Sequence, residues 1–189
     1  MPEGDLIPTT AEIPDEIMAK LQSRLAKLQS LYDADTLSPS AFAEKSLTLA
    51  SEIIHALGLK DKSVCKAGCH YCCIDVPVAI SSNEARLIAM HQKIKIKEPA
   101  RKENDFEYRK SGACRFLKNG MCSIYEVRPL ACRSFFSADS VQDCMDGNMH
   151  KTFTTGSNQS LLIIQAMLVM NKKRKKAGKA LHGEIEEWF

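Results

Sequence analysis

The sequence lacks the segments that mark exported and membrane-spanning chains. Residues 1–16 are acidic and contain proline, with no basic stretch and no apolar core, so we expect no secretory signal. The longest apolar run, residues 161–170, is interrupted by Gln165, whereas a helix that crosses a bilayer needs about 20 apolar residues. These absences predict a cytoplasmic protein with no membrane partner.

Familiar enzyme motifs are missing as well. The chain has no glycine-rich phosphate loop, no G-x-S-x-G and no H-E-x-x-H sequence. The formal net charge is only +3, and the basic run at residues 172–176 has no aromatic residues within it. This run favours a solvated helix end over a nucleic-acid or anionic-lipid site, because positive residues stabilise a helix C-terminus. We therefore expect no nucleic-acid partner.

Cysteine, in contrast, is concentrated in under half of the chain. All eight cysteines lie between residues 65 and 144, and four of them fall within residues 65–73. In a reducing compartment, clustered cysteines bind metal or carry out redox chemistry more often than they form disulfides. The metal-binding hypothesis takes all eight as candidate ligands: Cys65, Cys69, Cys72, Cys73, Cys114, Cys122, Cys132 and Cys144.

The fold predicted from the apolar periodicity is mainly α. Residues with apolar spacings of three and four predict helices over 15–32, 39–57, 82–92 and 158–172, packed around a cysteine-rich centre with one small β-hairpin. Ser81 and Glu84 form a capping box for the third helix. We expect one domain, 1–189, with a helical hairpin in 1–60, a metal-binding region in 65–144 and a C-terminal helix with basic tail in 158–189.

Two local geometries stay open at this point. Residues 65–73 could be a helix that points four thiols into an arc of about 100°, or a loop whose short spacings still let them reach one ion. Asn119-Gly120 is a strong hairpin signal. A two-residue turn places Cys114 and Cys122 on opposite faces of the hairpin, whereas a three-residue turn places them on the same face.

The segment around Cys132 favours a thiolate. Pro129 fits the first turn of a short helix, so Cys132 would lie near the N–H groups and positive dipole end of that helix. Arg128 and Arg133 flank it and would offset the negative charge of several thiolates. The ligands we favour most are Cys69, Cys72, Cys73, Cys122 and Cys132.

These motifs together resemble the YkgJ-like cysteine-cluster family, a zinc- or iron-chelating domain named for a CxxCxxCC motif. The matching parts are Cys69-x-x-Cys72-Cys73, the capped helix at Glu84, Cys114-x-Phe116-Leu117, Gly120-x-Cys122-x-Ile124-Tyr125, Arg128-Pro129-x-x-Cys132-Arg133 and the late Cys144. Cys65 departs from this pattern, since three residues rather than two separate it from Cys69. A similar cluster in flagellin lysine methylases resembles an iron–sulfur site.

The identity of the metal remains open in the sequence. Eight thiolates could hold two zinc ions, one four-iron cluster with four cysteines left over, or a two-iron cluster, and His70 or His150 could replace a thiolate. The Cys65-x-x-x-Cys69-x-Tyr71-Cys72 stretch also matches the radical SAM pattern, but the alternating β–α units of that class do not follow it.

Three functions are compatible with these patterns. The leading hypothesis is a cytoplasmic protein that holds an iron–sulfur cluster, with zinc almost equal, through clustered cysteines. The alternatives are an iron–sulfur redox or methyl-transfer enzyme component and a zinc-stabilised interaction module that uses the basic tail.

Overall fold

The computed structural model describes residues 6–8, 13–66, 68–74, 77–99, 112–138, 140–146, 152–154, 158–171, 175 and 177–189. Helices dominate these residues, and the strands are short and pair two by two, so the prediction of a mainly α fold with a small hairpin is confirmed. The helices are α1 (Asp15–Asp33), α2 (Pro39–Ala56), α3 (Leu59–Lys62), α4 (Ser82–Gln92), α5 (Leu130–Ser134), α6 (Val141–Asp146) and α7 (Gln159–Val169).

The strand pairs differ in direction. The parallel pair joins β1 (Leu6–Pro8) to β5 (Thr152–Thr154), and the antiparallel pairs join β2 (Ala79–Ser81) to β6 (His182–Glu184) and β3 (Leu117–Lys118) to β4 (Met121–Cys122). Single 3₁₀ turns cover Tyr71–Cys73, Tyr125–Val127 and Ile185–Glu187.

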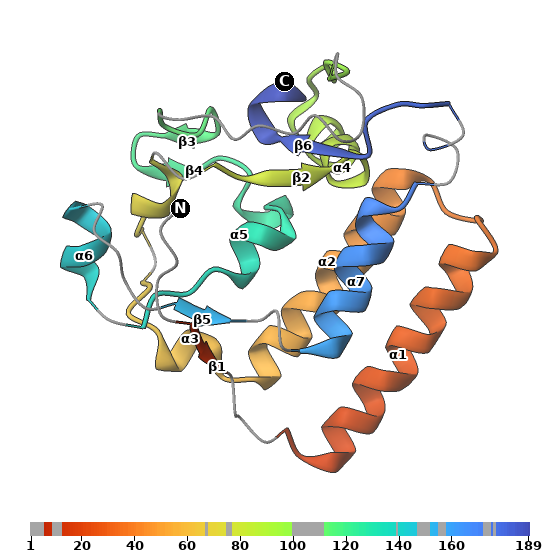
Figure 1. Cartoon of the computed structure of the whole chain (residues 1–189), viewed down its shortest axis with the longest axis horizontal. Coiled ribbons are helices and arrows are strands. Elements are labelled where there is room, and N and C mark those ends of the chain that lie inside the picture. The colour runs from red at the N-terminus through yellow and green to blue at the C-terminus, as the bar shows by residue number, and fades with distance from the viewer. Residues whose placement is uncertain are drawn as a thin grey trace.

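Helices α1 and α2 form the predicted helical hairpin (Figure 1). The Ser38 hydroxyl caps α2 by accepting the Ala41 amide at 3.3 Å, and Pro39 occupies the first turn. The chain leaves α2 through Gly58, whose φ of 64° is the left-handed conformation that ends many helices. Because its apolar residues recur at helical spacing, α1 buries one stripe against α2, namely Leu21, Leu25 and Leu28.

Two hydrophobic clusters support the fold. The first cluster lies between α1, α2, α4 and α7, and the second joins α4, β2, the segment after Cys114 and the C-terminal residues. Trp188 is only 1% exposed in the second cluster. No helix or strand was predicted for residues 180–189, yet β6 pairs with β2 and the following turn packs into this cluster.

One predicted helix boundary needs correction. Helix α7 ends at Val169, three residues before the predicted end at 172, because Met170 adopts an extended backbone.

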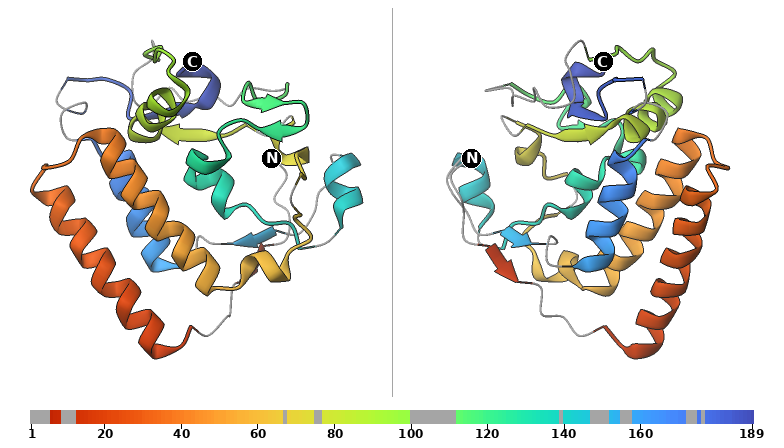
Figure 2. Two further views of the ribbon diagram at one scale, coloured as in Figure 1. Left: turned by 180° about the vertical axis from the view of Figure 1, so that it is seen from behind. Right: turned by 45° about the vertical axis from the view of Figure 1, so that its right-hand side comes forward.

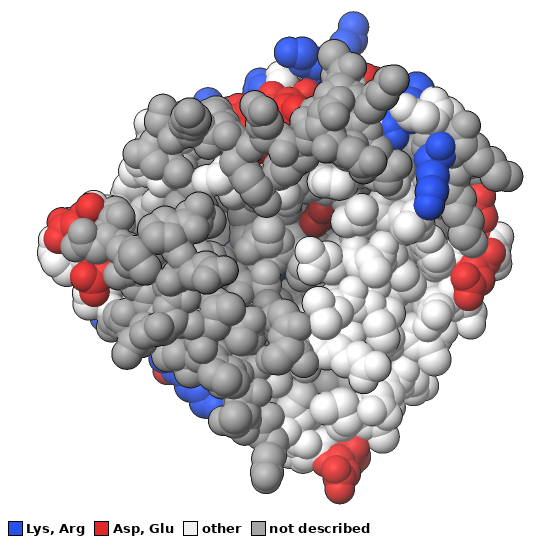
Figure 3. Space-filling model, in the orientation of Figure 1, with Lys and Arg blue, Asp and Glu red and all other residues white. Residues whose placement is uncertain are grey.

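The cysteine-bearing elements lie on the side of the molecule away from α1. Figure 2 shows from two further directions that α5, α6 and the β3–β4 hairpin occupy this side, while α1, α2 and α7 run side by side at the other. In Figure 3 the visible face has a broad area without charged side chains where α1 and α7 lie. Among the described helices, none combines the length and the hydropathy needed to span a bilayer.

Candidate metal centre

The first cysteine cluster lies in a loop and not in a regular α-helix. Of the two geometries left open for residues 65–73, the structure has the loop, with a single 3₁₀ turn at residues 71–73. Backbone hydrogen bonds fold it tightly: the Cys69 amide donates to the Lys66 carbonyl at 3.0 Å, and the Cys73 amide donates to the His70 carbonyl at 2.8 Å. Cys72 is exposed, whereas Cys69 and Cys73 are half-buried. The thiols are thus presented from a compact, irregular stretch of backbone.

The β3–β4 hairpin has the two-residue turn. Asn119 and Gly120 both have positive φ, 50° and 74°, and Leu117 pairs with Cys122, as a type I′ turn requires. Strict alternation would then send Cys114 and Cys122 to opposite faces. This alternation does not extend back to Cys114, because residues 114–117 form a turn before β3. The Leu117 amide closes that turn by donating to the Cys114 carbonyl at 2.9 Å. Both cysteines pack against the second hydrophobic cluster.

Direct backbone contacts join the first cluster to the hairpin region. The Cys114 amide donates to the Cys73 carbonyl at 2.7 Å, and Ile74 and Ala113 form an antiparallel bridge. The hairpin turn also approaches the loop, since a Cβ atom on Gly120 would lie 3.7 Å from the His70 ring. The segments that carry Cys73 and Cys114, 41 positions apart in the chain, are therefore neighbours in space.

Cys132 lies in the first turn of the short helix α5. Pro129 immediately precedes this helix, one position earlier than the sequence analysis expected. The Glu84 carboxylate fixes the helix start: one oxygen accepts the Leu130 amide at 2.8 Å, and the other accepts the Ser81 amide and hydroxyl, each at 2.7 Å. The predicted capping box is confirmed. Burial raises the pKa of Glu84, although these hydrogen bonds oppose the shift.

Arg133 acts chiefly as a clamp on the backbone beside Cys132. Its guanidinium donates to the Arg128 carbonyl at 2.7 Å, to the Glu126 carbonyl and to the Ser51 hydroxyl at 2.8 Å. Burial lowers the pKa of Arg133, and the nearby Cys132 thiol opposes that shift. The arginine therefore both shapes the segment and supplies positive charge next to a candidate ligand.

Arg128, which precedes α5 in the chain, contacts an aromatic ring. Its guanidinium carbon lies 3.8 Å from the centre of the Tyr125 ring, a cation–π distance. Its Nε atom is buried and has no hydrogen-bond partner among the described residues. Arg128 also favours the thiolate of Cys72, because its positive charge opposes the rise in the pKa of that thiol. Both flanking arginines are thus placed to offset thiolate charge.

Cys65 and Cys144 lie beside Ser137. The Ser137 amide donates to the Cys65 sulfur at 3.4 Å, and the Val64 amide donates to the Ser137 carbonyl at 3.0 Å. The Ser137 side chain is fully buried, and its hydroxyl makes no well-formed hydrogen bond to the described residues. It lies close enough to Cys144 to lower the pKa of that thiol. Helix α6, which carries Cys144, contacts the 71–73 turn.

Burial and neighbouring thiols both raise the pKa of several of the cysteines. Burial is the largest cause that raises the pKa of Cys65, Cys132 and Cys144. For Cys72 the largest cause is a hydrogen bond with the Cys73 thiol. Smaller contributions come from other thiols. Those that act on Cys132 are Cys72, Cys114 and Cys122, whereas those that act on Cys144 are Cys65, Cys69 and Cys72.

The residues fit a thiolate-bound metal by their chemistry. All eight cysteines are described and are free thiols, and soft thiolate sulfur suits zinc and iron–sulfur clusters alike. Two buried donors without partners among the described residues, Ser137 Oγ and Arg128 Nε, lie in the same region and could donate to thiolates. Within the described residues no three Cys, His, Asp or Glu side chains converge closely enough to hold one ion. Ligation would therefore require side-chain movement.

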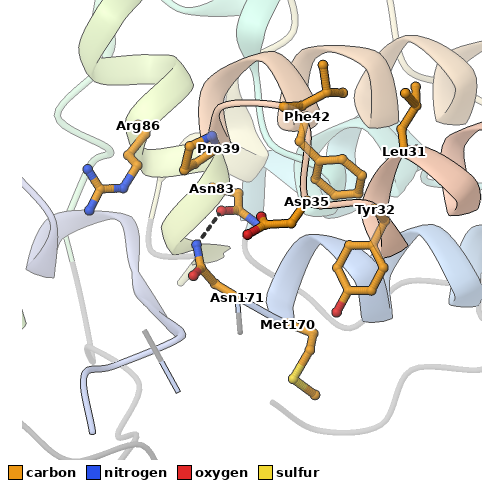
Figure 4. A pocket seen from close by; sticks show the side chains of 10 residues that line it. Leu31, Tyr32, Asp35, Pro39, Phe42, Asn83, Arg86, Met170 and Asn171 are labelled. Carbon is orange, nitrogen blue, oxygen red and sulfur yellow. Dashed lines mark hydrogen bonds between the residues drawn. The ribbon is translucent and has the colours of Figure 1, made fainter. Parts of the chain in front are cut away.

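A hollow of about 200 Å³ with both apolar and polar lining residues lies elsewhere, between the α1–α2 turn, the start of α4 and the end of α7 (Figure 4). Asn171 donates to the Asn83 side-chain oxygen at 3.0 Å on its wall, and Asn83 donates to the Leu168 carbonyl at 2.8 Å. No cysteine lines this hollow. It is therefore separate from the candidate metal centre.

Some predicted features cannot be placed. His150 and most of the basic run at 172–176 lie outside the described residues, with only Lys175 of that run described. The link from Glu84 to α5 and the position of Ser137 beside Cys65 were not predicted from the sequence. The capping box pointed to Glu84 but not to its second oxygen, and no sequence signal marked Ser137.

One comparison with known proteins gives a match. A family model described as "CxxCxxCC: Putative zinc- or iron-chelating domain" matches residues 64–158, just over half of the chain. No curated protein and no solved structure shows a significant match.

Proposed function

From the premise that the chain belongs to the CxxCxxCC domain family, whose members are described as chelating zinc or iron, we propose that it is a cytoplasmic protein that holds an iron–sulfur cluster, or zinc in its place, through its clustered cysteines. The likeness to YkgJ-like proteins, carried by the residues around Cys69 and Cys132, supports the same proposal. All eight cysteines are its candidate ligands.

The observation that carries the proposal is the meeting of distant cysteine segments. The 2.7 Å hydrogen bond from the Cys114 amide to the Cys73 carbonyl holds the loop of the first cluster against the hairpin region. Helix α5 brings Cys132 to the same side, and α6 brings Cys144 against the 71–73 turn.

The chain's own residues have distinct parts in this function. The thiols would lose their protons and bind the metal, which supplies either electron transfer, if it is an iron–sulfur cluster, or structural cross-linking, if it is zinc. Arg128 and Arg133 would offset the negative charge of the thiolates. Glu84 holds the start of α5, and thus Cys132, in place through the Leu130 amide.

Anaerobic purification followed by an absorption spectrum and metal analysis tests this proposal. An iron–sulfur cluster gives a brown protein with a broad absorption band at about 400 nm and equal amounts of iron and acid-labile sulfide. A colourless protein with stoichiometric zinc would overturn the preference for iron–sulfur but keep the metal site. A reduced protein that retains neither metal and binds neither on reconstitution would overturn the function itself.

A further inference from the structure

We propose that the hollow between the α1–α2 turn, the start of α4 and the end of α7 is a binding site for a small organic cation, a primary amine with an apolar body. The Asp35 carboxylate and the Asn83 amide would hold the amine, and the side chains of Tyr32, Phe42 and Met170 would contact the apolar body. This inference goes beyond the proposed metal-binding function, because no cysteine lines the hollow.

The size and depth of the hollow limit its occupant. Its volume of about 200 Å³ is below the roughly 300–1,000 Å³ of pockets that hold drug-sized ligands. Asp35 is exposed, whereas Asn83 is only 4% exposed. The wall therefore has a carboxylate on its solvent side and a buried amide on its inner side. A molecule with one ring or a short chain suits this space.

The buried amide has capacity for a polar ligand group. The Asn83 NH₂ group donates to the Leu168 carbonyl at 2.8 Å, and its oxygen accepts the Asn171 NH₂ group at 3.0 Å (Figure 4). A side-chain amide has two N–H donors, and its oxygen can accept two hydrogen bonds. Among the described residues, Asn83 thus uses half of its capacity on each side. Because buried polar groups are as a rule hydrogen-bonded, this remaining capacity points to a polar occupant.

Four helix ends meet around the hollow, and their charges favour a cation. The starts of α2 and α4 are already capped, by the Ser38 hydroxyl and by the Ser81–Glu84 box, which brings a carboxylate. The ends of α1 and α7 are the negative ends of their helix dipoles, and neither helix has a basic residue in its last turn. The two uncharged C-terminal turns therefore favour positive charge in the hollow.

Asp35 strengthens this preference at a position that suits glycine better. Its φ of 51° is the left-handed conformation that glycine usually supplies after the end of a helix. Its carboxylate also follows the negative end of α1. Residues held in such a conformation are common at binding sites. The charge is felt nearby, since burial raises the pKa of Tyr32 and the carboxylates of Asp33 and Asp35 raise it further.

Arg86 does not make the hollow an anion site. It is the second charged residue on the described part of the wall, and it pairs with the Glu98 carboxylate at 3.7 Å. In the view of Figure 4 its guanidinium points away from the Asn83 and Tyr32 side chains. Because Glu98 offsets the charge of Arg86, the charge that remains on this part of the wall is that of Asp35.

The apolar side of the hollow suits the body of an amine. The rings of Tyr32 and Phe42 lie with their centres 5.6 Å apart and are tilted by 44°. Phe42 is 6% exposed, so its ring is a fixed part of the wall, and Met170 is 37% exposed at the edge. Aromatic faces attract organic cations as well as apolar groups. A carboxylate next to two rings is therefore a suitable setting for an ammonium group on a short apolar chain.

Binding of phenethylamine to the full chain, as purified, tests the proposal. The ligand is titrated and the backbone amide shifts are followed by NMR. We expect saturable shifts confined to residues 31–42, 83–86 and 170–171, which surround the hollow. Phenethyl alcohol, which has no charge, and hydrocinnamate, which carries a carboxylate in place of the amine, should bind at least about tenfold more weakly, because a charged hydrogen bond is lost.

A matched pair of variants identifies the carboxylate. Asp35→Asn keeps the size of the side chain and tolerates the positive φ, so it should fold normally and bind phenethylamine about tenfold more weakly, with little change for phenethyl alcohol. The control is Asp61→Asn, which alters an exposed carboxylate on α3 that does not line the hollow and should leave binding unchanged.

Four results would overturn the proposal. They are shifts that do not saturate or that scatter over the surface, equal or tighter binding of hydrocinnamate, equal binding of phenethyl alcohol, and wild-type affinity in Asp35→Asn. None of these results bears on the cysteines, so the metal-binding function stands or falls by its own experiment.

Discussion

The Glu84 carboxylate accepts the Leu130 amide at 2.8 Å, and this contact joins the start of α4 to the start of α5. The two residues are 46 positions apart in the chain. The same carboxylate accepts both polar groups of Ser81, so one buried side chain closes a helix cap and positions the helix that carries Cys132. Its replacement should therefore affect both the stability of the fold and the metal centre.

We expect Glu84→Gln to lower the free energy of unfolding by about 1–3 kcal/mol, the usual cost of leaving a buried hydrogen-bonding group without a partner. A glutamine can accept on only one side, so its NH₂ group would face either the Ser81 amide or the Leu130 amide. Urea unfolding of the metal-free chain measures the change. Glu16→Gln, an exposed carboxylate in α1, is the control and should change stability by no more than about 0.5 kcal/mol. Equal effects of the two variants would contradict the role of Glu84.

The pH dependence of stability follows from the same side chain. Burial raises the folded-state pKa of Glu84 above its ordinary value of 4.5, so the folded chain retains a proton that the unfolded chain has lost. The stability from this proton is fully present below about pH 4.5 and is lost as the pH rises through the higher folded pKa. The free energy of unfolding of the wild type, relative to Glu84→Gln, should therefore fall across that window. A difference that rises with pH there would show that the hydrogen bonds to the carboxylate outweigh its burial.

Helical periodicity explains why much of the fold was predictable. The stripe of Leu21, Leu25 and Leu28 and the cap at Ser38 are local signals that each specify their own helix. The Asn119-Gly120 turn is equally local, since both residues accept positive φ. These elements were therefore placed within one to three residues of their ends.

The assembly of the site was less predictable because it depends on contacts between distant segments. No spacing rule states that the Cys73 carbonyl meets the Cys114 amide, or that Ser137 lies against Cys65. The prediction from strand alternation does not apply to Cys114, because this residue lies in a turn before β3. The sequence could identify the cysteines as a group, but the contacts between the segments that carry them needed the tertiary structure.

The contribution of the C-terminal residues to the core also could not be predicted from the sequence. Trp188 is 1% exposed in the second hydrophobic cluster, which also supports Cys114 and Cys122. We expect Trp188→Ala to lower the free energy of unfolding by about 3–5 kcal/mol, since it leaves a large cavity. Thermal or urea unfolding of the metal-free chain measures this, with Ile17→Ala at an exposed position of α1 as the control. A loss no larger than that of the control would show that the C-terminal turn contributes little to the cluster.

Cys132→Ser should lower the metal content of the purified chain. A hydroxyl is a much weaker ligand than a thiolate for zinc or iron, and Cys132 lies where Glu84 and Arg133 fix the start of α5. The measurement is the metal-to-protein ratio after anaerobic purification, compared with Ser134→Ala in the same helix. Full metal content in Cys132→Ser would remove this cysteine from the ligand set.

Removal of the metal should loosen the cysteine region while leaving the helical hairpin intact. Among its described residues, the loop from 64 to 74 contains one 3₁₀ turn and no α-helix, so metal–thiolate bonds would restrict it further and raise the protection of its amides. Helices α1 and α2 have a buried apolar interface and need no such support. Hydrogen exchange before and after chelation should therefore show faster exchange in 64–74 and 112–134, with little change in 15–56. Exchange that rises equally in α1 and α2 would mean that the whole fold depends on the metal, and unchanged exchange in the loop would mean that its cysteines do not hold one.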